Sequence, residues 1–208
     1  RMAAVLSPRT DDCAVHAGNP PNPPAPVALL AVSKTFPAEA VRAAYAAGQR
    51  AFGENYVQEL VEKQPKLPTD IEWHFIGHLQ RNKVKQIVRF IDCIETVDSQ
   101  RLLEEIDKEA AKAGRVIQCF LQIDIAKEET KHGMSFDEAL TVLNWHSKSV
   151  KSNTTITGLM GMATNTDDEA EIRSEFRKLH EFFNKVSKAY PTIKELSMGM
   201  SSDYHIAL

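Results

Sequence analysis

The chain has 208 residues, of which 43% are hydrophobic and 25% charged, so it is long enough for one globular domain with a sizeable core. The formal net charge of -3 gives no general attraction to nucleic acid or to an anionic membrane, and we expect neither as a partner. No apolar run reaches the roughly 18 residues of a membrane span, and no secretory signal pattern opens the chain. We therefore expect a cytoplasmic protein whose cysteines, Cys13, Cys93 and Cys119, are reduced thiols.

The first 26 residues differ in composition from the rest of the chain. The stretch 18–26 (GNPPNPPAP) holds five of the ten prolines. Proline fixes φ and lacks a backbone N–H, so this stretch suits neither a helix nor a central strand. We expect residues 1–26 to be a poorly ordered lead-in and residues 27–208 to form the domain.

From residue 27 onward, short apolar runs alternate with helical patterns. Residues 27–33 (VALLAVS) are typical of a strand buried on both faces. Residues 37–47 predict a helix, with Pro37 in its first turn and Gly48 just beyond its end. Further strands are predicted at residues 51–53, 72–77, 93–97, 116–125, 156–162 and 196–200. Further helices are predicted at residues 56–63, 82–88, 101–113, 136–145 and 167–189, and from 202 to the end.

This alternation favours a parallel sheet, because parallel neighbours need crossover connections. Seven strand–helix units fit an α/β fold of the (β/α)8 TIM-barrel type better than a doubly wound sheet. The chain stops at Leu208, within the last helix, so we expect the barrel to lack its eighth strand. The first and seventh strands would then be open edges, which favours poor solubility or dimerisation.

Active sites of such barrels lie at the C-terminal ends of the strands. The polar or glycine positions that follow apolar runs are Lys34, Glu54, Asn55, Gly77, His78, Asp98, Asp124, Thr164 and Ser201. Partial desolvation would disfavour the ammonium form of Lys34 and make its amine a better nucleophile toward an aldehyde, although a solvated loop lysine is the alternative.

Ser201 precedes a helix start and suits either a phosphate contact or an ordinary N-cap. Asn55 suits either a hydrogen bond to a ring substituent or a turn. His74 alternates within a strand and is interpreted as a satisfied core histidine. The seven histidines show no ligand spacing, so we expect no metal site. The sequence contains no glycine-rich nucleotide loop and no nucleophile elbow.

Five motifs together resemble the pyridoxal phosphate homeostasis protein family, small barrels that bind pyridoxal 5'-phosphate (PLP) and are related to the N-terminal domain of alanine racemase. The resemblance covers roughly residues 27–208. The motifs are ALLAVSK at 28–34, GENYVQE at 53–59, WHFIGHLQRNK at 73–83, GLMGMA at 158–163 and SMGMSSDY at 197–204.

The resemblance implies that Lys34 forms the covalent aldimine, a Schiff base, with PLP. It implies that Ser201, with Gly199 and Met200 in the same motif, contacts the phosphate, and that Asn55 lies beside the cofactor. A further lysine of the family, in the loop after the fifth strand, matches Lys131. The family has no securely assigned reaction and is thought to buffer PLP for vitamin B6 homeostasis and to pass it to PLP-dependent apoenzymes. We therefore predict a PLP carrier, not an enzyme, with no catalytic residues.

The sequence departs from the family at both ends. The family begins with an amphipathic helix that residues 1–26 do not resemble. The family also continues into an eighth strand, a glycine-rich segment that supplies N–H groups to the phosphate, and an arginine that faces the pyridine nitrogen. We expect phosphate capture and the tuning of the ring to be weaker without them.

Three other functions stay open at this point. A PLP-dependent racemase needs two bases flanking the α-carbon; in the alanine racemase fold the second base is a tyrosine of another domain, and Tyr56 and Tyr204 match it poorly by motif. A lysine Schiff-base aldolase would use Lys34 on a ketose phosphate directly. A non-enzymatic interaction module would leave Lys34 solvated.

Overall fold

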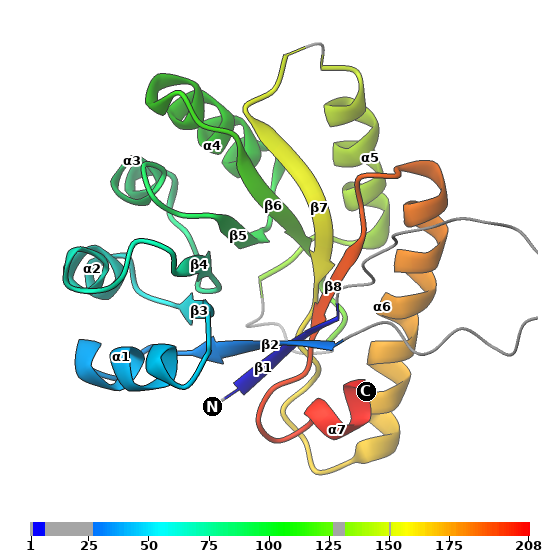
Figure 1. Ribbon diagram of the computed structural model, residues 1–208. Helices are drawn as coiled ribbons and strands as arrows, with labels where there is room; N and C mark the ends of the chain where they lie inside the picture. Colours follow the sequence, from blue (N-terminus) through cyan, green and yellow to red (C-terminus); the bar gives the residue numbers. More distant parts are fainter. Residues whose placement is uncertain (1, 7–26, 127–131, 150) are drawn as a thin grey trace, which may run out of the picture.

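The structure of the protein is a computed structural model that describes residues 2–6, 27–126, 132–149 and 151–208. Strands form one closed barrel and helices cover its outside (Figure 1). The strands are β1 (Met2–Leu6), β2 (Val27–Val32), β3 (Ala51–Glu54), β4 (Glu72–Phe75), β5 (Cys93–Val97), β6 (Ile117–Gln122), β7 (Thr154–Met160) and β8 (Glu195–Met198). The helices are α1 (Ala38–Ala46), α2 (Val57–Lys63), α3 (Val84–Ile87), α4 (Gln100–Ala113), α5 (Phe136–Ser147), α6 (Glu169–Ala189) and α7 (Tyr204–Ala207), with short 3-10 helices η1 (Gln64–Lys66) and η2 (Arg81–Lys83).

The predicted TIM-type architecture is confirmed. Strands β2 to β8 follow one another around the barrel, and each pairs in parallel with the next. These are the seven strands predicted from residue 27 onward, with ends shifted by a few residues. The helices between them supply the crossovers that parallel strands require.

The remaining position in the barrel is filled by β1, which runs antiparallel to both of its neighbours. Ala4 lies opposite Leu29 of β2 and opposite Met198 of β8. The prediction of two open edges is therefore wrong, because the first and last parallel strands both pair with β1 (Figure 1). Residues 2–6 were expected to belong to a poorly ordered lead-in, but they form this strand. Residues 7–26, the rest of that stretch, lie outside the described residues.

Local signals in the sequence set the helix boundaries. Ser99 Oγ accepts a hydrogen bond from the N–H of Leu102 at the start of α4, and Gly114 ends that helix with a φ of 65°. Ser135 and Glu138 form a capping box at the start of α5. These caps join residues close together in the chain, so the sequence alone indicates where α4 and α5 begin and where α4 ends.

The hydrophobic core has two layers. The larger layer lies between the strands and the helices, and α6 contributes an apolar stripe that includes Ile172, Phe176 and Leu179. A second buried cluster joins residues of four different strands on the inner side of the barrel: Leu30, Cys93, Phe120 and Met160. The inside of the barrel is therefore packed with side chains, as is usual for this architecture. None of the described helices has the length and apolarity needed to cross a membrane.

Candidate functional site

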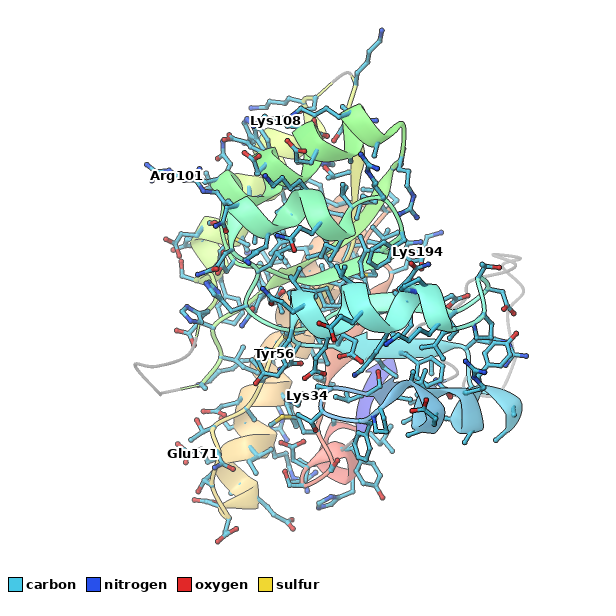
Figure 2. The ribbon with its side chains drawn as sticks, turned by 90° about the vertical axis from the view of Figure 1, so that its left-hand side faces the viewer. Lys34, Tyr56, Arg101, Lys108, Glu171 and Lys194 are labelled. Atoms are coloured by element: carbon cyan, nitrogen blue, oxygen red, sulfur yellow. The ribbon has the colours of Figure 1, made fainter. Side chains whose placement is uncertain are left out.

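A cavity lies at the C-terminal ends of the parallel strands. Its lining comes mainly from the ends of β2, β7 and β8, with single contributions from the ends of β3 and β4 and from β5. Figure 2 labels Lys34, which follows β2, and the exposed Tyr56, which follows β3. The lining residues are Val32, Lys34, Asn55, Ile76, Glu95, Met160, Gly161, Met162, Ser197, Met198, Gly199 and Met200.

Lys34 stands in a turn that is held on both sides. On the N-terminal side, the N–H of Ser33 donates to the carbonyl of Gly53 at 2.9 Å. On the C-terminal side, Thr35 has a φ of 66°, and its N–H donates to Glu59 Oε2 at 2.9 Å. A left-handed conformation is strained for a β-branched residue, and such strain persists only where the surrounding contacts hold it. The backbone that carries Lys34 is therefore placed by specific bonds.

A buried ionic network lies directly behind this turn. Glu54 is fully buried, and its Oε1 accepts hydrogen bonds from Ser33 Oγ and Lys63 Nζ, both at 2.7 Å. Lys63 Nζ also donates to the carbonyl of Ser33 at 2.9 Å and to Glu59 Oε2 at 3.0 Å. The network thus joins the ends of β2 and β3 to α2. It holds the segments that carry Lys34 and Asn55, the two predicted site residues from these strands.

The two carboxylates of the network differ in their electrostatics. Burial raises the pKa of Glu54, and the hydrogen bonds from Lys63 and Ser33 offset only part of that effect. Burial would also raise the pKa of Glu59, but the hydrogen bonds from the Thr35 N–H and from Lys63 outweigh it, so this pKa is lowered. Among the described residues, Glu54 Oε2 has no hydrogen-bond partner, which makes Glu54 depend strongly on Lys63.

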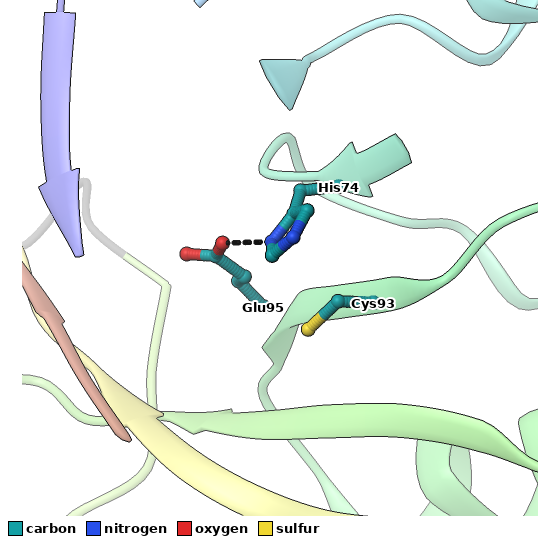
Figure 3. Close-up of side chains that lie close together, drawn as sticks. All are labelled: His74, Cys93 and Glu95. Atoms are coloured by element: carbon teal, nitrogen blue, oxygen red, sulfur yellow. Dashed lines mark hydrogen bonds and ion pairs between the residues drawn. The ribbon is translucent and has the colours of Figure 1, made fainter. Parts of the chain in front are cut away.

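A second buried network contributes Glu95 and Ser197 to the floor of the cavity. Figure 3 shows the hydrogen bond that joins Glu95 of this network to His74. Glu95 points inward from β5, accepting a hydrogen bond from Ser197 Oγ at 2.6 Å and one from His74 Nδ1 at 2.6 Å. Burial would lower the pKa of His74, but the hydrogen bond and charge of Glu95 prevail and raise it. His74 is therefore the satisfied core histidine that the sequence predicted. Beneath it, a second cavity at the opposite end of the barrel is lined by His74, Cys93 and Glu195, among others.

Cys93 takes no part in the hydrogen bonds of this floor. Its side chain is 2% exposed, and burial raises the pKa of the thiol well above its usual value. Cys119 is also buried, and burial raises its pKa as well. Burial thus disfavours the thiolate form of both, in agreement with the reduced thiols expected for these two residues, while Cys13 lies outside the described residues.

The structure gathers four of the five predicted cofactor residues at the cavity: Lys34, Asn55, Gly199 and Met200. Ser201 is exposed and is not one of the residues that line the cavity, so its role as a phosphate contact stays a prediction. Lys131 lies outside the described residues.

In the turn after β8, Gly199 contributes backbone atoms to the cavity lining. Gly199 has a φ of 88°, and a Cβ at this position would lie 2.9 Å from Ala207 Cβ, so only glycine fits without strain. The N–H of Met200 donates to Asp203 Oδ1, and the carbonyl of Met200 accepts from the N–H of Tyr204 at 2.8 Å. These bonds fold the turn back onto α7, with Gly199 and Met200 facing the cavity.

Sequence reasoning did not find Glu95, Ser197, Glu59 or Lys63. Glu95 is a charged residue within a strand that is buried on both faces, and this was an available signal for an inward-facing polar group. The i,i+4 pair of Glu59 and Lys63 on α2 was another available signal. Of the other predicted strand-end residues, Thr164 is bound to the buried Glu175, and Asp124 is exposed.

Comparison with known proteins assigns the chain to a family. The family model for the alanine racemase N-terminal domain matches residues 23–207. A pyridoxal phosphate homeostasis protein of Haemophilus influenzae is 38% identical over 88% of this chain and 78% of its own length. A mouse (Mus musculus) protein of the same name is 37% identical over 86% of this chain and 70% of its own length. The chain therefore belongs to the alanine racemase N-terminal domain family and, within it, to the pyridoxal phosphate homeostasis proteins.

Solved structures agree with this assignment. PipY of Synechococcus elongatus PCC7942, in a structure without PLP, superposes with a TM-score of 0.80 at 39% identity and covers 86% of this chain and 84% of PipY. The structure of PipY with PLP bound superposes with a TM-score of 0.76. The recognition of the family from its motifs is thus confirmed.

Proposed function

We propose that this chain binds PLP in the cavity at the C-terminal ends of its strands, through Lys34, and carries or buffers it in vitamin B6 homeostasis. The observation that carries the proposal is the placement of Lys34: it is the one lysine in the lining of this cavity, within the described residues. Lys34 is half-buried, and it follows a strand whose end is held by the Glu54–Lys63 network. PipY, which has been solved with PLP bound, shares the fold at 39% identity.

The residues of the cavity fit the chemistry of this cofactor. Lys34 supplies a primary amine for the aldehyde of PLP. Asn55 and Ser197 supply polar groups within a mostly apolar lining that suits the faces of a pyridine ring. Gly199, in the turn after β8, contributes backbone atoms to the cavity lining, and backbone N–H groups are suitable partners for a phosphate. When bound, PLP supplies an electron sink for substrates that carry an amino group.

Carriage is better supported than racemisation. Racemisation needs two groups that exchange protons on opposite faces of a substrate. Besides Lys34, the ionisable lining residue within the described part is Glu95, whose two oxygens already accept hydrogen bonds from Ser197 and His74. Tyr56 and Tyr204 are 53% and 46% exposed, and neither lines the cavity. The curated relatives are likewise named as homeostasis proteins.

The test of the binding site is chemical trapping. Purified protein is mixed with PLP, reduced with borohydride and digested, and the modified lysine is identified by mass spectrometry. We expect the reduced adduct on Lys34 and its loss in Lys34→Arg, which keeps the charge but forms no imine. Lys66→Ala is a matched control, because this exposed lysine lies outside the cavity lining. Equal labelling of the Lys34→Arg protein at another lysine would refute the assignment.

Carrier and enzyme are separated by turnover. PLP-loaded protein is incubated with D-alanine or L-alanine, and the enantiomeric ratio is followed. We expect no conversion above the rate of free PLP. Conversion that Lys34→Arg abolishes would instead establish a racemase. Trapping with PLP but not with a ketose phosphate removes the aldolase alternative.

We further propose that PLP-dependent apoenzymes are the recipients and that the protein works in the cytoplasm. Loaded protein is mixed with an apoenzyme either directly or across a dialysis membrane that passes PLP alone. Faster activation on direct mixing indicates transfer by contact, whereas equal rates indicate release into solution. Cell fractionation tests the location.

A further inference from the structure

A second group of ligand-type side chains lies at the same end of the barrel, outside the Lys34 cavity. His78 follows β4, Asp98 follows β5, and His132 precedes α5 in the connection from β6. One potential ligand atom from each of the three lies within 4.8 Å of the others. His78 Nδ1 is 3.5 Å from Asp98 Oδ2, and the two imidazole rings are stacked with centroids 4.2 Å apart. None of the three lines the Lys34 cavity.

Hydrogen bonds hold each of these residues or its immediate neighbour. Thr96 Oγ1 donates to the carbonyl of Gly77 at 2.6 Å, next to His78. Gln122 Nε2 donates to the carbonyl of His132 at 2.6 Å. Ser99 Oγ donates to Asp98 Oδ1 at 3.1 Å, while the other oxygen, Oδ2, faces His78. Two of the three side chains therefore start at the ends of the adjacent strands β4 and β5, and the third starts from a connection that is bonded to the end of β6.

We propose that His78, Asp98 and His132 form a binding site for a divalent transition-metal ion of the zinc type. Two imidazoles and one carboxylate are a common ligand set for zinc and its neighbours, with further positions left for water. The C-terminal face of a parallel barrel is also where such loops converge. A bound ion would tie the loop after β4 to the connection after β6.

Binding requires a modest rearrangement that the exposure of the site permits. Tetrahedral zinc ligands at about 2.0–2.1 Å from the metal lie roughly 3.3 Å from one another, so the present separations must shorten. The stacked rings, inclined at 22°, must also turn so that one nitrogen of each points at the ion. The side chain of His78 is 48% exposed and His132 is also exposed, so both rings have room to turn, whereas the side chain of Asp98 is only 18% exposed.

The other three-residue group, His74, Cys93 and Glu95, is less suited to a metal ion (Figure 3). Both oxygens of Glu95 and the Nδ1 of His74 are already engaged in hydrogen bonds of 2.6 Å. Metal binding there would have to break these buried bonds and deprotonate a buried thiol. At His78, Asp98 and His132, metal binding would disrupt only the weaker His78–Asp98 contact and the stacking of the two imidazole rings.

The test is metal titration of tag-free, PLP-free protein after treatment with a chelator. Omitting PLP removes its own metal chelation and keeps the outcome independent of the proposed cofactor site. Zn²⁺ is titrated by calorimetry, and Co²⁺ is titrated by its visible absorption, which reports coordination number. We expect one equivalent to bind, with affinity falling at least tenfold in each of His78→Ala, His132→Ala and Asp98→Asn.

His180→Ala is the matched control, because His180 is an exposed histidine on α6. This variant should bind as the unchanged protein does. Circular dichroism of each variant checks that folding is retained. Absence of binding by the unchanged protein, or equal binding by all three site variants, would overturn the proposal.

Discussion

We expect Lys63 to make a large contribution to the stability of the strand ends that carry Lys34 and Asn55. The side chain of Lys63 is 10% exposed, and its Nζ lies 2.7 Å from Oε1 of Glu54, whose side chain is 0% exposed. Substitution Lys63→Met keeps much of the apolar stem but removes the charge. It leaves Glu54 buried without a counter-charge, and breaking a buried pair in this way costs about 3–5 kcal/mol.

The assay is urea unfolding at pH 7.5, followed by circular dichroism, with Lys66→Ala as the exposed control. We expect a fall in the free energy of unfolding of about 3–5 kcal/mol for Lys63→Met and a change within about 0.5 kcal/mol for the control. The double variant Glu54→Gln/Lys63→Met should recover part of the loss, because no charge then remains buried. A loss below about 1 kcal/mol for Lys63→Met, at an unchanged denaturant slope, would refute the reasoning.

The stability loss caused by Lys63→Met should depend on pH in a direction that follows from the pKa of Glu54. The folded-state pKa of Glu54 is raised, so the folded protein holds this proton more tightly than the unfolded chain does. This contribution stabilises the fold below the unfolded pKa and is lost as pH rises through the folded pKa. Without Lys63 the pKa of Glu54 rises further. The deficit of Lys63→Met should therefore shrink as pH is lowered from 7.5 toward 5.

Three other predictions follow from the fold and the cavity. Since the folded-state pKa of His74 is raised, the His74–Glu95 pair stabilises the fold below the unfolded pKa and loses this effect as pH rises through the folded pKa. In urea unfolding, Glu95→Gln should therefore lower the free energy of unfolding more at pH 6 than at pH 8. An equal loss at the two pH values would contradict this. Gly199→Ala should destabilise the fold by about 1–2 kcal/mol, because φ is 88° and the new Cβ meets Ala207. An unchanged melting temperature would count against this expectation. The same substitution should also weaken PLP binding, measured by absorbance titration. Deletion of residues 2–6 should open the edges of β2 and β8 and cause self-association on gel filtration, whereas a monomer as stable as the full chain would show that β1 is dispensable.

The parallel part of the fold could be predicted because its signals are local. Apolar runs such as that of β2, ended by Lys34, and caps such as Ser99 and Gly114 are visible within a few residues of sequence. The strand Met2–Leu6 could not be predicted in the same way. It is a five-residue apolar run that no helical pattern follows in the sequence, and the proline-rich stretch separates it from the rest. Its place depends on β2 and β8 needing a shared neighbour.

The site shows the same division. Lys34, Asn55 and Gly199 could be located from their places after strands and from family motifs. Glu95 could not, because its role depends on Ser197 and His74, which come from other strands. The cluster of His78 and His132 was likewise invisible, since ligand spacing along the chain says nothing about loops that meet in space.

The position of β1 also has a consequence for the order in which the barrel is completed during synthesis. Of the described strands, β1 is made before β2 to β7, whereas its other neighbour, β8, is made only after all of them. Pairs between segments so far apart in sequence form slowly, because a long loop must be closed before they gain any contact. Until β8 emerges, β1 can pair only with β2, and the exposed edge of the growing sheet is open to chaperones and to other nascent chains.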